Sequence, residues 1–334
     1  MGHIEKRFIG RTAVEVTTLG LGTATLGGSR LDISWAERDA IVRAAWDAGV
    51  RYFDTAPFYG VGAAERAVGD ALRERRRGDW VLSTKVGRLL RPRAAWTDSM
   101  SAWGRPMPFD VVYDYSYDGI MRSFEDSFQR LGLAHIDILL VHDIGAYQHG
   151  AAAHPGLMRT LRESGFRALE ELRSSGAVSA IGLGVNEREV CIEAMGFGDW
   201  DAFLLAGRYT LLEQASLDDL LPLCVERGTS LIIGGPLNSG ILAGRDTWNY
   251  VAAPEEVRAR VNAIRGVCDR HNVPLAAAAL QFPLAHPAVA AIIPGPRTAA
   301  EFAENLVLRA HRIPPELWTE LRHAGLLHPA APTP

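Results

Sequence analysis

The sequence contains almost no lysine. Of its 35 basic residues only Lys6 and Lys85 are lysines, and all the others are arginines. Lys6 lies in the polar N-terminal stretch, whereas Lys85 lies in the apolar run 80–87, where a charge is costly to bury without a partner. A guanidinium is a broad planar fork, whereas an ammonium is a compact charge that can lie against one oxygen. Either position 85 requires an ammonium, or Lys85 ends a strand and its charged group reaches water. The residues expected near it distinguish these two interpretations.

Cysteine, long apolar runs and an excess of one charge are also lacking. The three cysteines, Cys191, Cys224 and Cys268, are far apart, which predicts reduced thiols and neither a disulfide framework nor a zinc site. No apolar run approaches the about 18 residues of a membrane span, and the N-terminus has no signal-peptide pattern. A net charge of −4 argues against nucleic acid or an anionic membrane as partner. We expect a cytoplasmic protein that acts on a small molecule, as a monomer or small homo-oligomer.

What the sequence does contain is a regular alternation of short apolar runs and amphipathic stretches. The runs are rich in Val, Ile and Leu, as in 136–141, which is typical of parallel strands covered on both faces. Eight β-then-α units in succession predict an α/β fold closed into a (β/α)8 TIM barrel, with a doubly wound open sheet as the alternative. The predicted strands are 19–22, 51–54, 81–85, 136–142, 180–185, 202–206, 230–234 and 291–294, and the predicted helices 35–48, 63–76, 117–131, 163–175, 187–195, 217–227, 254–271 and 298–309.

No shift in composition divides the chain, so residues 1–334 are predicted to form a single domain. An N-terminal β-hairpin at 7–18 is expected to close the bottom of the barrel, and an extra C-terminal helix is expected at 314–327. The longest irregular segment is predicted at 88–116, and its aromatic content favours an ordered pocket wall.

Four polar side chains stand at or just beyond the ends of consecutive predicted strands, where barrel enzymes carry their active sites. They are Asp54, Tyr59, Lys85 and His142. Taken alone, Asp54 reads as a turn or cap residue, Tyr59 as a loop aromatic and His142 as a core histidine. His142 has no second ligand at a metal-binding spacing, so no metal site is predicted. Four such residues at successive strand ends favour a shared role.

These four side chains fit together chemically. A phenol with a pKa near 10 is a poor base at neutral pH, and an adjacent ammonium lowers that pKa. A carboxylate keeps the ammonium charged and fixed, and an imidazole can orient a substrate oxygen or relay its proton. The set predicts a general acid/base that acts on one substrate oxygen, with Lys85 making Tyr59 more acidic.

Several motifs extend over nearly the whole chain. They are Gly20-Leu21-Gly22-Thr23, the segment 47–56, Tyr59-Gly60, Ser83-Thr84-Lys85 and the segment 137–142. With them the chain resembles the aldo-keto reductase superfamily. The resemblance implies a (β/α)8 barrel, a catalytic tetrad of Asp54, Tyr59, Lys85 and His142, and a nicotinamide cofactor bound across the barrel mouth.

The resemblance also implies where the cofactor binds. Segment 293–298 is similar to the part that holds the pyrophosphate and the adenosine ribose, loop 234–240 to the part that closes over the pyrophosphate, and Asn186 to the residue that holds the nicotinamide amide. Backbone N–H groups at glycines can approach phosphate oxygens. The implied cofactor-binding residues are Gly22, Thr23, Asp54, Asn186, Gly234, Pro236, Leu237, Asn238, Gly240, Gly295, Pro296, Arg297, Glu301, Glu304 and Asn305.

Departures from the family pattern bear on the choice of cofactor. Members that favour NADPH commonly carry a basic residue at the positions of Gly295 and Glu301. A carboxylate there repels a 2′-phosphate and can accept a hydrogen bond from a free ribose hydroxyl, although Arg297 is near enough to compensate. We therefore expect NAD, with NADP as the alternative. A Rossmann site is excluded at Gly20-Leu21-Gly22, because the third glycine is missing.

Segments 142–145, 181–186, 207–212 and 235–240 resemble a subgroup of the family that oxidises cyclic hemiacetals, of an aldose or of pyridoxal, to lactones. This resemblance implies oxidation of L-fucose or another D-threo-type aldose at its anomeric carbon. Tyr59 and His142 are expected to bind the anomeric hydroxyl, with Trp96 and Trp103 against the sugar ring. The alternatives are a pyridoxal 4-dehydrogenase, an NADPH-dependent aldehyde or ketone reductase, and a non-catalytic barrel that senses the cofactor.

Overall fold

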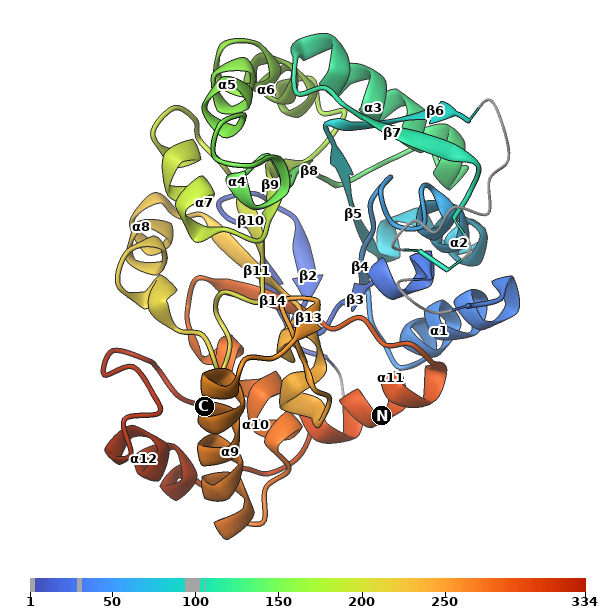
Figure 1. Ribbon diagram of the computed structural model, residues 1–334. Helices are drawn as coiled ribbons and strands as arrows, with labels where there is room; N and C mark the ends of the chain where they lie inside the picture. The colour runs from blue at the N-terminus through green and yellow to red at the C-terminus, as the bar shows by residue number, and fades with distance from the viewer. Residues whose placement is uncertain (1–3, 29–31, 94–102, 105) are drawn as a thin grey trace.

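The computed structural model describes residues 4–28, 32–93, 103–104 and 106–334. Its central feature is a sheet of eight parallel strands in the order β14-β11-β10-β9-β8-β5-β4-β3, seen in Figure 1 as a ring surrounded by helices. The strands are β3 (Leu21–Gly22), β4 (Tyr52–Asp54), β5 (Val81–Val86), β8 (Ile138–His142), β9 (Ala180–Val185), β10 (Ala202–Ala206), β11 (Ser230–Gly234) and β14 (Val289–Ile293).

Backbone hydrogen bonds close the two ends of this sheet on each other. Gly20 donates its N–H to the carbonyl of Ile292 at 2.9 Å, and Ile292 donates to Thr18 at 2.9 Å. Gly22 donates to Pro294 at 3.1 Å, so the contact continues to the carboxyl end of the strands. The predicted (β/α)8 barrel is therefore confirmed, and the open-sheet alternative is wrong.

Helices cover the outside of the barrel at the predicted places. They are α1 (Trp35–Asp47), α2 (Ala63–Leu72), α3 (Tyr117–Leu131), α6 (Phe166–Ser174), α7 (Arg188–Met195), α8 (Leu220–Arg227), α9 (Glu255–Arg270) and α11 (Ala299–Arg309). Ser34 and Glu37 form a capping box at the start of α1, and Gly132 ends α3 in the left-handed region with φ 63°. The predicted extra helix at the C-terminus is α12 (Pro315–His323). Three shorter helices have no predicted counterpart: α4 (Ala146–His149), α5 (His154–Thr160) and α10 (Leu275–Gln281).

The N-terminal hairpin plugs the barrel. Strands β1 (Lys6–Phe8) and β2 (Glu15–Thr17) pair antiparallel, and β2 lies within the ring of strands in Figure 1. The hairpin's Ile9 and Val16 are fully buried in a cluster with inward-facing residues of the barrel strands. This apolar filling closes the lower half of the barrel interior, so the polar side chains at the upper ends of the strands are the ones that remain available for chemistry.

Two hairpins lie outside the barrel strands. β6 (Arg88–Pro92) pairs antiparallel with β7 (Phe109–Tyr113), so the prediction of an irregular segment from 88 to 116 is wrong over these two strands. The second hairpin, β12 (Thr247–Trp248) with β13 (Val251–Ala252), lies between β11 and α9. Its two turn residues, Asn249 and Tyr250, have φ of 47° and 64°, as a type I′ turn requires.

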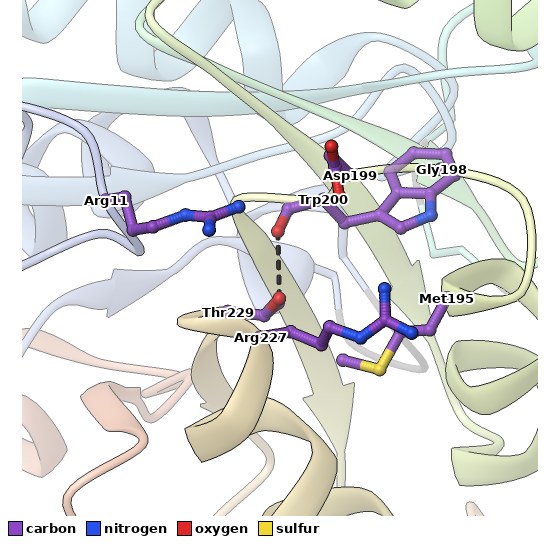
Figure 2. Close-up of a pocket in the computed structure, with 7 residues that line it drawn as sticks. All are labelled: Arg11, Met195, Gly198, Asp199, Trp200, Arg227 and Thr229. Carbon is purple, nitrogen blue, oxygen red and sulfur yellow. Dashed lines mark hydrogen bonds between the residues drawn. The ribbon is translucent and has the colours of Figure 1, made fainter.

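A small pocket lies near the amino ends of β10 and β11, at the end of the barrel opposite to the polar side chains at the carboxyl ends of the strands (Figure 2). It is lined by Arg11 of the β1–β2 loop, by Trp200 ahead of β10, and by Arg227 and Thr229 ahead of β11. Its volume of about 10 Å³ has room for about one water molecule, so it does not suit a metabolite. In the part of the chain that the structure describes, no helix is long and apolar enough to cross a membrane.

Candidate active site

A buried ion pair joins the ends of β4 and β5. Lys85 donates from Nζ to both oxygens of Asp54, at 2.7 Å to Oδ2 and 3.0 Å to Oδ1, and to the carbonyl of Thr55 at 2.9 Å. Ser83 donates to Oδ1 of Asp54 at 2.7 Å, so the carboxylate is held from two sides. Burial raises the pKa of Asp54 above its ordinary value, and the ammonium of Lys85 opposes that rise.

Tyr59 and His142 complete the set of four predicted residues. Tyr59 lies on the loop between β4 and α2, and its ring meets that of His142 edge to face, with centroids 5.7 Å apart. The Nζ atom of Lys85 lies 4.7 Å from the centroid of the Tyr59 ring. His142 ends β8 and is buried. The structure therefore brings together Asp54, Tyr59, Lys85 and His142 at the carboxyl ends of neighbouring strands.

The electrostatics of Tyr59 differ from the expectation that Lys85 makes this phenol more acidic. Burial, with the negative charges of Asp54 and Asp143, raises the pKa of Tyr59 well above its ordinary value. The reason is that the charge of Lys85 is matched by the carboxylate that it contacts through both oxygens. Arg88 is the cation that opposes the rise. The prediction about the acidity of Tyr59 is thus wrong for this structure, in which the phenol is protonated at neutral pH.

His142 is held in its neutral form. Burial lowers the pKa of its imidazole well below the ordinary value, and the positive charges of Arg88 and Lys85 lower it further. A neutral imidazole has one donor and one acceptor nitrogen, so it can orient a hydroxyl without carrying charge. Within the described ranges no group of three or more His, Cys, Asp or Glu side chains is placed to hold a metal ion.

Sequence reasoning missed two residues of this site, Arg88 and Asp143. Arg88 follows the Lys85 strand directly and is fully buried, and its Nη2 lies 2.7 Å from Oδ2 of Asp143. Asn186 donates from Nδ2 to Oδ1 of Asp143 at 3.1 Å. Asp143 could have been identified from the sequence, because it directly follows His142 in the chain. Arg88 has no such signal, because arginine is the usual basic residue in this sequence.

Aromatic rings line the region beside Tyr59. The ring of Trp103 lies 5.3 Å from that of Phe58 and 6.1 Å from that of Tyr59, and Trp103 is buried. Tyr250, at the tip of the β12–β13 hairpin, is half exposed and lies within electrostatic range of Tyr59. The predicted contact residue Trp96 lies outside the described residues. The aromatic wall is therefore built from the loop between β4 and α2, the Trp103 segment and the second hairpin.

The loop after β11 has the backbone geometry of an anion-binding site. Gly235, Asn238, Ser239 and Gly240 all have positive φ, of 55°, 45°, 58° and 101°. The N–H groups of Asn238 and Gly240 are bonded to carbonyls within the loop, and turns of this kind can bind an anion through N–H groups that are left over. The side chain of Asn238 is buried and bonded within the protein, accepting from Thr210 at 2.6 Å. The loop therefore suits a pyrophosphate through its backbone, while Asn238 holds the loop in shape. Of the other predicted residues here, Gly234 ends β11, Pro236 is buried and Leu237 is half-buried.

The remaining predicted cofactor residues lie at β3 and at the start of α11. Gly22 ends β3, and Thr23 donates its hydroxyl to the carbonyl of Asp54 at 2.8 Å. Glu301 accepts from the backbone N–H of Arg297 at 2.7 Å and from Nη2 of Arg245 at 2.6 Å. The carboxylate is thus paired, which weakens its repulsion of a phosphate. Gly295 and Pro296 precede the helix, and Glu304 is exposed and Asn305 buried on it.

Together these groups fit a dinucleotide. Asn186 lies beside the tetrad through its contact with Asp143, and the β11 loop and the α11 N-terminus offer backbone donors for phosphates. A barrel with this site is an oxidoreductase of the nicotinamide-dependent type. The Aldo/keto reductase family matches residues 18–325, and the chain therefore belongs to that family.

Individual relatives extend over almost the whole chain. A pyridoxal 4-dehydrogenase of Microbacterium luteolum is 48% identical over 97% of this chain and 98% of its own length. A D-threo-aldose 1-dehydrogenase of a Pseudomonas species is 37% identical over 96% of each chain. Among solved structures, the holo form of an aldo-keto reductase from Bacillus halodurans superposes with a TM-score of 0.76 at 25% identity, with 98% of each chain covered.

Proposed function

We propose that this protein is an NAD-dependent dehydrogenase that oxidises the hemiacetal carbon of a cyclic substrate to a lactone. The observation that carries the proposal is the placement of the Tyr59 phenol beside the neutral imidazole of His142, with the Lys85–Asp54 pair behind it. A phenol and an imidazole at one oxygen can move the hydroxyl proton that must leave when a hemiacetal becomes a lactone. The two named dehydrogenase relatives support the same direction of reaction.

The roles of the residues follow from their charge states. His142, held neutral, orients the hemiacetal hydroxyl by a hydrogen bond. For oxidation, Tyr59 first loses its own proton to solvent, and Arg88 offsets the charge of the phenolate that results. This phenolate accepts the hydroxyl proton and returns to the neutral phenol, beside the fixed ammonium of Lys85. Asp54 keeps Lys85 charged and fixed. When bound, NAD supplies the carbon that accepts the hydride. Its carboxamide would be held by Asn186, and its phosphates by the loop at 234–240 and the start of α11.

Pyridoxal is the first substrate to test, and aldoses are the second. Both compounds form cyclic hemiacetals, so the same proton transfer serves either. The chain is 48% identical to the pyridoxal dehydrogenase and 37% identical to the aldose dehydrogenase. This difference favours pyridoxal over the aldose expected from the sequence motifs. An aromatic wall at Phe58 and Trp103 suits the face of a pyridine ring or of a pyranose.

The test is a turnover assay with purified protein. Pyridoxal, L-fucose and a panel of other aldoses are each offered with NAD and with NADP, and reduced cofactor and lactone are measured. We expect a lactone to form from pyridoxal or an aldose, faster with NAD. Tyr59→Phe should remove this turnover, whereas Tyr117→Phe, a matched change at a tyrosine bonded to Glu171 on the outer helices, should not. If only NADPH-dependent reduction of open-chain carbonyls is seen, the dehydrogenase proposal is wrong. If no carbonyl or hemiacetal reacts, the protein is a cofactor-binding barrel.

A further inference from the structure

Asp143 has an unusual backbone. It is the first residue after β8, and its φ of 41° lies in the left-handed region that few residues other than glycine adopt. Its N–H donates to the carbonyl of Gly184 at 2.9 Å, which ties this residue to the neighbouring parallel strand β9. Aspartate tolerates this conformation better than most residues, yet strain of this kind persists only where the surroundings hold it, and it is concentrated at functional sites.

The carboxylate of Asp143 contacts three side chains from different strand ends. Oδ2 lies 2.7 Å from Nη2 of Arg88 and 3.4 Å from Nε2 of His142. Oδ1 accepts from Nδ2 of Asn186 at 3.1 Å. The carboxylate of Asp143 thus connects His142, which is expected to face the substrate, with Asn186, which is expected to face the nicotinamide. It also pairs with the buried cation Arg88.

These contacts select which atoms of the two partners remain available. With Nδ2 of Asn186 bonded to Asp143, its Oδ1 is the side-chain atom left to accept a hydrogen bond. The negative charge next to Nε2 of His142 favours the proton on that nitrogen. Nδ1 is buried and has no hydrogen-bond partner among the described residues, so the N–H at Nε2 is the ring group that can donate to the substrate oxygen, whose own proton remains for Tyr59.

Arg88 supplies the counter-charge. Its guanidinium lies 4.3 Å above the Phe58 ring and also donates to Gln148 at 3.2 Å. A buried guanidinium without its carboxylate is strongly unfavourable, so Arg88 and Asp143 depend on each other. We propose that Asp143 is a positioning residue that sets the orientation of Asn186 toward the cofactor and of His142 toward the substrate, with Arg88 as its counter-ion. The proposal rests on the proposed function for the meaning of those two orientations.

The Asp143–Arg88 pair also acts on Tyr59. The charge of Asp143 raises the pKa of this phenol and the charge of Arg88 lowers it. Removal of the charge of Asp143 should therefore lower the pKa of Tyr59, and removal of the charge of Arg88 should raise it. The other ionisable groups around the pair and Tyr59 include Tyr52, Asp54, Lys85, Tyr113, Tyr115, His142, His149, Glu187 and Tyr250.

The first experiment is an NMR titration of protein labelled with 13C at the tyrosine ring, with Tyr59→Phe to assign the resonance. Protein alone and its complex with NAD are both titrated. Asp143→Asn keeps the shape and removes the charge, so the pKa of Tyr59 should fall. Arg88→Gln should raise it, and Arg88→Lys, which keeps the charge, should leave it near the wild-type value. Asp118→Asn, at an exposed position on α3, is the matched control and should shift nothing.

The second experiment measures NADH binding by fluorescence titration. Asp143→Ala removes the acceptor that holds Asn186, and we expect about a tenfold weaker affinity. Asp143→Asn retains an acceptor oxygen and should bind within about twofold of wild type. A purely structural role predicts equal effects of both variants on affinity, with no opposed shifts of the Tyr59 pKa, and that result would overturn the proposal. Neither readout needs turnover, so they can succeed even where every hemiacetal proves inert and the proposed function fails.

Discussion

The Nζ atom of Lys85 lies 2.7 Å from Oδ2 of Asp54, and the two side chains are only 1% and 2% exposed. A buried charge is tolerated when it is paired and fully hydrogen-bonded, and here Thr55 and Ser83 provide the remaining bonds. The pair fixes a positive charge 4.7 Å from the ring of Tyr59 without letting it move toward the phenol. Lys85, one of only two lysines in the chain, is therefore a fixed and buried part of the site.

Replacement of Lys85 by arginine should nearly abolish turnover. A Cβ at Gly184 would lie 2.9 Å from Cε of Lys85, so the lysine stem packs on backbone and a guanidinium has no space there. We expect kcat to fall by about 100-fold or more, the usual range for a lost acid/base arrangement. NADH affinity, measured by fluorescence titration, should change little. Lys6→Arg, at the exposed partner of Glu15, is the matched control. Normal turnover in Lys85→Arg would mean that an ammonium is not required.

The two directions of the reaction should depend on pH in opposite ways. Burial and the carboxylates of Asp54 and Asp143 raise the pKa of Tyr59 well above its ordinary value, so its phenolate becomes more abundant only as pH rises. Oxidation uses the phenolate as base, and its kcat should climb through the alkaline range. Reduction uses the phenol as acid, and its kcat should stay level at neutral pH and fall in strong alkali.

The acidic side of these profiles tests His142. Its pKa is lowered well below the ordinary value, so the imidazole stays neutral through the mildly acidic range. We therefore expect no loss of kcat that can be attributed to His142 as the pH falls into the mildly acidic range. Profiles of kcat against pH for wild type and Tyr59→Phe provide the check. An oxidative rate that does not change with pH would contradict the role of Tyr59.

The parts of the site that could be predicted are those that local patterns mark. Asp54, Lys85 and His142 each end or nearly end a predicted strand, and parallel strands bring such residues to one edge. Contacts between distant positions carry no such pattern. Arg88 pairs with Asp143, 55 positions away, and nothing near either residue indicates the other.

Two errors have clear physical causes. The β6–β7 hairpin was missed because its first strand carries Arg88, Arg91 and Pro92, which do not alternate as a half-buried strand does. The pKa of Tyr59 was misjudged because residue types alone do not tell how fully Asp54 compensates Lys85. The barrel itself was predictable because short apolar strands alternate with amphipathic helices along the chain.

Cofactor preference should respond to the pairing of Glu301 with Arg245, whose Nη2 donates to it at 2.6 Å. In Glu301→Gln the carboxylate is gone, and Arg245 and Arg297 are free to contact a 2′-phosphate. We expect the ratio of kcat/KM for NADP to that for NAD to rise by about tenfold, which is about 1.4 kcal/mol. Glu304→Gln, at an exposed position of the same helix, is the control and should leave the ratio unchanged. An unchanged ratio in Glu301→Gln would show that this carboxylate does not select the cofactor.

Tyr250 should affect substrate binding more than chemistry. It sits at the turn of the β12–β13 hairpin, half exposed and within electrostatic range of Tyr59. Loss of its ring removes an aromatic surface from the mouth of the site, and Tyr250→Ala should raise KM several-fold with kcat nearly unchanged. Val251→Ala, the exposed neighbour on β13, is the matched control. A fall in kcat with unchanged KM would place Tyr250 in the chemical step instead.

Stability should depend on the close approach of α2 to the end of α3. A Cβ added at Gly69 would lie 1.7 Å from the carbonyl oxygen of Leu131, a backbone atom that cannot move aside easily. Gly69→Ala should therefore lower the free energy of unfolding by about 2–3 kcal/mol through overpacking. Gly78→Ala is the matched control, because a Cβ there meets nothing within 4 Å and its φ is not positive. That control should stabilise the protein slightly, by about 0.4–1 kcal/mol, through the unfolded state. Urea unfolding measures both changes. Equal stability of the two variants would mean that these helices can separate at no cost, contrary to the packing described above.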